Sequence, residues 1–340
     1  MNSFGRIFRI HIFGESHGES VGVCMDGIPA GLPLTVEDFS EDIERRKGGT
    51  QKGTTPRQES DLPIFKTGIF NNKTTGAPLT ILFENKNVRS SDYEKQRAVP
   101  RPGHADFVAS KKFGGFEDYR GSGHFSGRLT VGLVAVGVVA KRLLDLTPNH
   151  SPKERGIQVH ASILEIGGET DLEKGLQKAI DAKDSIGGII ECRAGNLPVG
   201  LGEPFFDSAE SLLSHAVLAI PAVRGIEFGT GFAAARMFGS EHNDAIEDAN
   251  GKTKTNHAGG IVGGLTNGNE LVFRIAIKPT SSTPKEQQTL NWETNTVEPF
   301  SVKGRHDLCI ALRVPVILEA VTAMVLVDLM MLEQRIPRIL

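Results

Sequence analysis

The sequence predicts a mixed fold of helices and strands around a large core. Two long apolar segments, residues 129–144 and 310–332, have the composition of helices buried on nearly all sides. Strand-like segments and shorter helical segments alternate loosely in the rest of the chain. The 39 glycines among 340 residues indicate many tight turns rather than disorder, because hydrophobic residues still make up 39% of the chain.

Composition excludes several classes of function. A net charge of −3 provides no overall basic field for nucleic acid, so any cationic site must be local. The first apolar segment is bracketed by Arg128 and Lys141 and is too short to span a membrane. Three scattered cysteines without a Cys-x-x-Cys pair indicate a reducing compartment, and the first residues lack the features of a signal peptide. We therefore expect a cytoplasmic protein that contacts neither nucleic acid nor membrane, and we predict no metal site.

A strand predicted over residues 8–13 leads into residues 14–18, Gly-Glu-Ser-His-Gly. This motif fits Gly-x-Ser-x-Gly, but a serine-hydrolase elbow needs a helix after the turn, whereas residues 20–25 alternate like a second strand. A rigid bend that carries the Ser16 hydroxyl and the His17 imidazole suits general acid catalysis. A turn whose histidine only caps a strand explains this stretch equally well.

A cationic loop follows a helix predicted over residues 35–44. Residues 45–57 combine five basic side chains with several glycines and threonines. An isolated basic run is usually solvated surface, but the glycines would allow this loop to close on a polyanion. Strands are then predicted at residues 62–70 and 79–84, with a turn signal at residues 71–73.

Two further loops contain candidate site residues. In the polar loop over residues 89–106, Arg101 and Asp106 lie close enough in sequence to orient His104 and set its pKa, although a lone loop histidine is most often only exposed. The Gly/Ser-rich loop at residues 121–128 ends in Arg128 and runs into the first apolar helix. Free N–H groups at a helix start, beside an arginine, form an anion site.

The second half of the chain continues the alternation. Strands are predicted at residues 156–166, 187–194, 222–228, 231–236 and 271–277, and helices at residues 171–182 and 208–219. The loop at residues 303–307 precedes the second apolar helix, as the first loop precedes the first helix. This similarity of pattern indicates a weak internal repeat.

Two more motifs fit a phosphorylated ligand. The glycine-rich residues 256–264 are followed by a turn instead of the helix that a dinucleotide fold requires, so they suit close backbone approach to a flat or phosphorylated group. Residues 278–282 gather one ammonium and three hydroxyl groups. They form either a phosphate cradle or an ordinary Ser/Thr turn.

Together, these motifs resemble the chorismate synthase family. They are, in the family's order and over essentially the whole chain, residues 14–18, 23–29, 101–106 (Arg-Pro-Gly-His-Ala-Asp), 126–130, 256–260 (Asn-His-Ala-Gly-Gly), 278–282 (Lys-Pro-Thr-Ser-Ser) and 305–307 (Arg-His-Asp). The resemblance implies the last step of the shikimate pathway, in which 5-enolpyruvylshikimate 3-phosphate loses phosphate and a proton by 1,4-elimination to give chorismate. Such an enzyme is a carbon–oxygen lyase that requires reduced FMN without net redox change.

The resemblance also implies roles for single residues. His17 is the acid for the leaving phosphate, His104 protonates the reduced flavin near N1, and Asp307 moves a proton near flavin N5. The implied substrate contacts are Ser16, Arg45, Arg46, Lys52 and Arg128. The implied FMN contacts are His124, Phe125, Ser126, Pro221, Ala222, Gly263, Lys278, Pro279, Thr280, Ser281, Ser282 and Arg305.

The implied fold is α+β, with core helices sandwiched between antiparallel β-sheets in a single catalytic domain over residues 1–340, assembled as a homotetramer. Periodicity alone indicates only a mixed α/β enzyme that binds a polyanion. No reductase domain is recognisable, so we expect an external flavin reductase, with NADPH only an indirect source of reduced flavin. The sequence departs from the family at Lys52, His124, Pro221 and Leu308, where the family often has arginine, arginine, a polar residue and proline.

Two other functions stay open at this point. A serine hydrolase would use Ser16 as its nucleophile, and a fluorophosphonate probe would then label that residue. A non-catalytic protein of the same fold would bind flavin without converting 5-enolpyruvylshikimate 3-phosphate.

Overall fold

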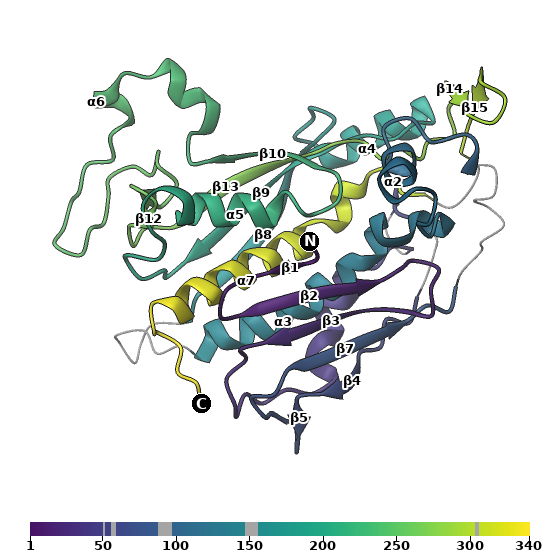
Figure 1. Cartoon of the computed structure of the whole chain (residues 1–340). Helices are drawn as coiled ribbons and strands as arrows, with labels where there is room; N and C mark the ends of the chain where they lie inside the picture. Colours follow the sequence, from purple (N-terminus) through teal and green to yellow (C-terminus); the bar gives the residue numbers. More distant parts are fainter. Residues whose placement is uncertain (50–51, 56–58, 88–96, 147–155, 303–305) are drawn as a thin grey trace.

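Two antiparallel sheets form the outer layers of the fold (Figure 1). The computed structural model describes residues 1–49, 52–55, 59–87, 97–146, 156–302 and 306–340. The first sheet has the order β1 (Ser3–Phe4), β2 (Arg9–Gly14), β3 (Ser20–Asp26), β7 (Leu79–Glu84), β4 (Ile64–Thr67). The second has the order β10 (Val223–Phe228), β13 (Leu271–Ile277), β9 (Gly188–Gly195), β8 (Gln158–Ile166).

Helices α3 (Thr130–Leu146) and α7 (Pro315–Leu332) lie side by side between the sheets (Figure 1). α3 contacts β3 of the first sheet, and α7 contacts β8 of the second. A Cβ atom at Gly137 of α3 would lie 2.2 Å from the Cβ of Ala320 on α7, so glycine permits their close approach. The predicted sandwich of core helices between antiparallel sheets is therefore confirmed.

Helix α7 is long and apolar enough to cross a membrane, but 89% of this segment is buried inside the fold. Its Asp328 carboxylate accepts hydrogen bonds from the backbone N–H groups of Arg6, Ile7 and Phe8 at 2.8–3.1 Å. A buried carboxylate is stable when several N–H donors satisfy it. α7 is therefore a core helix that also anchors the start of the chain.

The smaller elements surround this sandwich. They are the helices α1 (Ser40–Arg46), α2 (Asp106–Phe113), α4 (Leu172–Ala182), α5 (Ala209–Val217) and α6 (Gly239–His242), the strand pairs β5–β6 (Ile69–Phe70, Lys73–Thr74), β11–β12 (Ile261–Val262, Leu265–Thr266) and β14–β15 (Gln287–Asn291, Thr296–Phe300), and short 3-10 helices. Asp171 caps α4 by accepting hydrogen bonds from the N–H groups of Glu173 and Lys174.

Most of the predicted elements are confirmed within a few residues, but some predictions are wrong. Residues 231–236, predicted as a strand, form a 3-10 helix because Gly231 adopts a φ of 60° and the Phe232 N–H bonds to the Glu227 carboxylate. The second core helix begins only at Pro315, after a separate 3-10 helix over Ile310–Arg313. Helix α2 and the pair β14–β15 were not predicted.

Candidate active site

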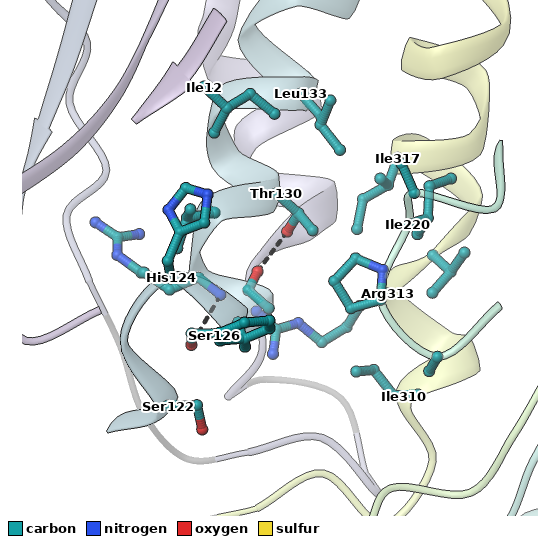
Figure 2. A pocket seen from close by; sticks show the side chains of 18 of the residues that line it. Ile12, Ser122, His124, Ser126, Thr130, Leu133, Ile220, Ile310, Arg313 and Ile317 are labelled. Carbon is teal, nitrogen blue, oxygen red and sulfur yellow. Dashed lines mark hydrogen bonds between the residues drawn. The ribbon is translucent and has the colours of Figure 1, made fainter. Parts of the chain in front are cut away.

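A cavity of about 710 Å³ opens between the first turns of α3 and α7 (Figure 2). Leu133 from α3, Ile317 from α7 and Ile12 from β2 contribute to an apolar wall. Polar groups, among them Ser122 and Arg313, line the opposite part. Small-molecule sites have volumes of about 300–1,000 Å³ and combine apolar walls with a few convergent polar groups.

Loops that are distant in sequence bring most of the predicted site residues to this cavity. The ones that line it are Arg46, His104, His124, Phe125, Ser126, Arg128, Pro221, Ala222, Lys278, Thr280, Ser281, Ser282 and Asp307. Of the predicted site residues that the structure describes, those that do not line the cavity are Ser16, His17, Arg45, Lys52, Gly263 and Pro279. Arg305 lies outside the described residues.

Ser16 and His17 lie just beneath the cavity wall. The Ser16 side chain is fully buried, and its Oγ has no hydrogen-bond partner in the described part of the chain. His17 is 7% exposed and packs under Gly121, where a Cβ atom would lie 2.3 Å from the imidazole Cδ2. Because β2 and β3 flank this turn and no helix follows it, the geometry of a nucleophile elbow is missing here.

His104 is oriented by a buried arginine and a carboxylate. Its Nδ1 lies 2.7 Å from Asp106 Oδ1, and the Arg101 guanidinium donates to both oxygens of Asp106 at 2.7 and 2.8 Å. Burial alone would raise the pKa of Asp106, but the hydrogen bonds from Arg101 and His104 hold that pKa well below its usual range. Asp106 and Arg101 both contact Nδ1 of His104, at 2.7 and 3.0 Å, so Nε2 is the ring nitrogen that can face a ligand.

Arg101 also connects the loops around the cavity. It donates to Ser122 Oγ at 2.8 Å and to Ser282 Oγ at 3.2 Å. Ser281 Oγ donates to the Gly103 carbonyl at 2.7 Å and accepts a hydrogen bond from Lys278 Nζ at 3.0 Å. Burial lowers the pKa of Lys278, and Arg224 adds to this effect. The His104 loop, the Gly/Ser-rich loop and residues 278–282 therefore form one connected polar wall.

Arg46 and Arg128 share one carboxylate, Asp61, which sequence reasoning missed. Arg46 Nη2 donates to Asp61 Oδ2 at 2.8 Å, and Arg128 Nη1 donates to Oδ1. Desolvation lowers the pKa of Arg46 to about 10, although Asp61 opposes this effect. Burial alone would raise the pKa of Asp61, but Arg46 and Arg128 lower it. The only sequence signal for this group is an aspartate shortly after the cationic loop.

Asp307 is held on both carboxylate oxygens. The Thr55 N–H donates to Oδ1 at 2.8 Å, and Arg313, which sequence reasoning also missed, donates to Oδ2 at 3.1 Å. Arg313 Nε donates in addition to the carbonyl oxygen of Arg46 at 2.8 Å. The loop at residues 303–307 was expected to precede the second apolar helix directly. Instead, the 3-10 helix over Ile310–Arg313 separates Asp307 from the first turn of α7. The Thr55 N–H and the Arg313 guanidinium hold the Asp307 carboxylate.

His124 connects two loops rather than presenting free nitrogens. Its Nδ1 lies 2.9 Å from the Gly14 carbonyl oxygen, and its Nε2 lies 3.0 Å from the Asn2 amide oxygen. The ring therefore fastens the Gly/Ser-rich loop to Gly14 and to Asn2. The neighbouring Phe125 packs against Phe113 of α2, with ring centroids 6.3 Å apart.

Arg45 points away from the cavity. It forms a bidentate pair with Glu319 of α7 at 2.7 Å, and Lys141 of α3 donates to the same carboxylate at 2.8 Å. The Glu319 side chain is only 2% exposed. Although burial alone would raise the pKa of Glu319, Arg45 and Lys141 lower it. This cluster fastens α1 to the core helices, in contrast to the substrate contact expected for Arg45.

We expect Glu319→Gln to lower the free energy of unfolding by about 1–2 kcal/mol, because it removes one of the two anions that Arg45 and Lys141 share, while Asp42 still accepts a hydrogen bond from each at 2.9 Å. Since the folded-state pKa of Glu319 is depressed, its contribution is complete above about pH 4.3 and is lost as the pH falls through the folded pKa. Denaturant unfolding of both proteins at pH 7 and in acid measures this difference. A stability difference that grows in acid would contradict the assignment.

Within the described residues, no group of three or more His, Cys, Asp or Glu side chains is placed to hold a metal ion. Lys52 donates to Gln177 of α4 at 3.1 Å on the surface. Gly263 lies in the β11–β12 turn, away from the cavity of its own chain.

The chain is similar to known proteins along its whole length. A family model described as chorismate synthase matches residues 8–331. A chorismate synthase of Chitinophaga pinensis is 68% identical over 339 residues, which cover 100% of this chain and 99% of that protein. A chorismate synthase of Dehalococcoides mccartyi is 43% identical over 360 residues, with 100% and 99% covered.

Comparison of structures agrees with the sequences. A solved structure titled "Crystal Structure of Chorismate Synthase" superposes with a TM-score of 0.73 at 25% identity, and covers 97% of this chain and 93% of that one. The chain therefore belongs to the chorismate synthase family of lyases, which catalyses the final step of the shikimate pathway.

Proposed function

We propose that this chain forms chorismate from 5-enolpyruvylshikimate 3-phosphate in the cavity between α3 and α7, with reduced FMN bound beside the substrate. The observation that supports this most is the convergence of Arg46, Arg128, His104 and Asp307 on one cavity from four separate parts of the sequence. We further propose that residues 1–340 act as a single catalytic unit.

The cavity suits a flat, phosphorylated cofactor. An apolar wall faces a wall of hydroxyl, ammonium and guanidinium groups, which fits an aromatic ring system with a polar edge and an anionic chain. FMN contacts are assigned to Ser126, Phe125, Pro221, Ala222, Lys278, Thr280, Ser281 and Ser282, with His124 fixing the loop. When bound there, reduced FMN would supply transient electron donation for the departure of phosphate, with no net redox change.

The substrate carries a phosphate and two carboxylates, so several cations must converge on it. Three arginines, Arg46, Arg128 and Arg313, meet at the cavity and are partly neutralised by two aspartates, Asp61 and Asp307. The group therefore keeps a net positive charge. Arg46 Nε is a buried donor without a partner among the described residues, and an anionic group of the substrate would satisfy it.

Three residues handle protons in this proposal. His17 donates a proton to the leaving phosphate. His104, with Nδ1 committed to Asp106, holds a proton at Nε2 toward the flavin edge. Asp307 helps to move a proton near flavin N5 as the substrate's C–H bond breaks. Ser16, beside His17, and Lys52 are kept as proposed substrate contacts, although neither lines the cavity.

The oligomeric state of the enzyme and its source of reduced flavin are also proposals. Because Gly263 does not line the cavity of its own chain, its proposed FMN contact would require a second copy, as the homotetramer implied by the family resemblance provides. Reduced flavin would come from an external flavin reductase, with NADPH as an indirect source. The Cys192 thiol, whose pKa burial raises to about 12, is an inert core group that fits a reducing, cytoplasmic setting.

An anaerobic assay with dithionite-reduced FMN and 5-enolpyruvylshikimate 3-phosphate tests the proposal through chorismate absorbance. We expect chorismate to form only when reduced flavin is present. Flavin binding without turnover would instead identify a non-catalytic binding protein, and labelling of Ser16 by a fluorophosphonate would identify a hydrolase.

We expect Arg46→Ala and Arg128→Ala each to raise the substrate dissociation constant at least ~10-fold, since a chain of net charge −3 must hold a polyanion with local cations. Binding by the wild-type protein should also weaken steeply with salt. Calorimetric titration of substrate at several salt concentrations measures both effects. If neither substitution changed the affinity, these arginines would have only a structural role.

A further inference from the structure

Asp61 is the buried link between the two arginines assigned to the substrate. Its side chain is 0% exposed, whereas those of Arg46 and Arg128 are each 4% exposed. Each carboxylate oxygen accepts a hydrogen bond from a different guanidinium, so one residue sets the separation of the two cations. Neither the catalytic roles nor the ligand contacts assigned above include Asp61.

Arg128 and Arg46 differ in how many of their guanidinium nitrogens have a partner in the protein. Every guanidinium nitrogen of Arg128 has a partner in the protein, because its Nε donates to Asn85 Oδ1 at 2.9 Å, its Nη1 to Asp61, and its Nη2 to the Glu84 carbonyl oxygen at 3.3 Å, which leaves one N–H on each Nη for a ligand. Arg46 also donates to Thr130 Oγ1 at 3.3 Å, but its Nε has no partner in the described part of the chain. The nitrogen without a partner therefore belongs to a guanidinium that Asp61 holds in place at the cavity wall.

Asn85 connects Arg128 to the turn that carries His17, the proposed general acid. Its Nδ2 donates to the carbonyl oxygens of Glu15 and Gly18 at 3.0 and 2.9 Å, on either side of His17. The anion-binding arginines and the turn that carries the proton donor are thus joined through Asp61, Arg128 and Asn85. A displacement of the arginines would also displace His17 relative to the substrate phosphate.

The charge of the arrangement matters as much as its geometry. Two desolvated guanidinium groups without a counterion would hold any phosphate strongly, including the inorganic phosphate that the reaction releases. With Asp61 ionised, the three groups have a net charge of +1. An anion is then oriented by two cations but is attracted by only one unit of net charge.

We propose that Asp61 is a positioning residue that fixes the distance between the Arg46 and Arg128 guanidinium groups and cancels one of their two charges, which orients the anionic substrate and permits release of phosphate. This inference rests on the proposed function, because it takes these two arginines as part of the substrate site.

Asp61→Asn and Glu319→Gln form a matched pair of variants. Both neutralise a buried carboxylate that holds two basic side chains, but only Asp61 lines the cavity. For Asp61→Asn we expect inorganic phosphate to bind at least ~10-fold more tightly in a titration of the flavin-free protein, and kcat to fall at least ~10-fold. Glu319→Gln should leave both quantities unchanged below its melting temperature. Unchanged phosphate affinity or unchanged kcat in folded Asp61→Asn would overturn the proposal.

If Asp61→Asn does not fold, Asp61→Glu tests the positioning role of Asp61 instead. It keeps the charge but shifts the carboxylate by one methylene group, so phosphate affinity should stay near that of the wild type while kcat falls at least ~10-fold. A wild-type kcat for Asp61→Glu would overturn the positioning role. Phosphate titration needs neither flavin nor turnover, and wild-type chorismate formation separately tests the proposed function.

Discussion

Replacement of Asp307 by asparagine is expected to slow chorismate formation at least ~10²-fold while reduced FMN and substrate still bind nearly normally. Asparagine retains the shape of the side chain and one oxygen that can accept the hydrogen bond from the Thr55 N–H. It cannot accept a proton, however. The variant therefore separates the binding function of this position from its function as a base.

Single-turnover assays with dithionite-reduced FMN measure the rate, and calorimetric titration measures the binding of each ligand. Asp184→Asn provides a matched control, because Asp184 also accepts hydrogen bonds, from the Ser185 N–H and Thr283 Oγ1, but does not line the cavity. A loss of turnover in Asp307→Asn that weaker binding explains completely would show that Asp307 only organises the loop.

The fold was predictable in outline because the composition of the two core helices identifies them as buried helices. Residues 130–146 and 315–332 are apolar on nearly all faces, and only burial inside the protein accommodates such helices. The sandwich architecture came from the family resemblance rather than from periodicity. The strand predicted at residues 231–236 was wrong because Gly231 adopts a positive φ and the Glu227 carboxylate accepts the Phe232 N–H, and the spacing of apolar residues records neither feature.

The site was predictable where single motifs carry it and unpredictable where distant residues meet. His104 and Asp106 are two residues apart, and their pairing could be inferred from one motif. Asp61 and Arg128 are 67 residues apart, so nothing local indicates that they pair. Arg45 was expected to contact substrate together with Arg46. Adjacent residues on a helix point in different directions, however, and of these two arginines only Arg46 lines the cavity, whereas Arg45 pairs with Glu319.

His17→Ala is expected to reduce chorismate formation by ~10²–10⁴-fold, the usual contribution of a general acid, and to change the dissociation constant of FMN by less than ~3-fold. The reason for this separation lies in the placement of the ring. His17 does not line the cavity in which the flavin contacts are assigned, but lies beneath Gly121 at its edge. Loss of the imidazole removes a proton donor and leaves the cofactor wall intact.

The position of His17 also determines how its role can be tested. Because the ring is only 7% exposed, it can reach the leaving phosphate only if the backbone at Gly121 shifts when substrate binds. Turnover and flavin titration of His17→Ala should be compared with those of His11→Ala, whose exposed ring lies 2.7 Å from Ser3 Oγ and does not line the cavity. We expect wild-type turnover from the His11 variant. Wild-type turnover from His17→Ala would remove this residue from the mechanism and leave the phosphate to depart with a proton from solvent or from another group at the cavity.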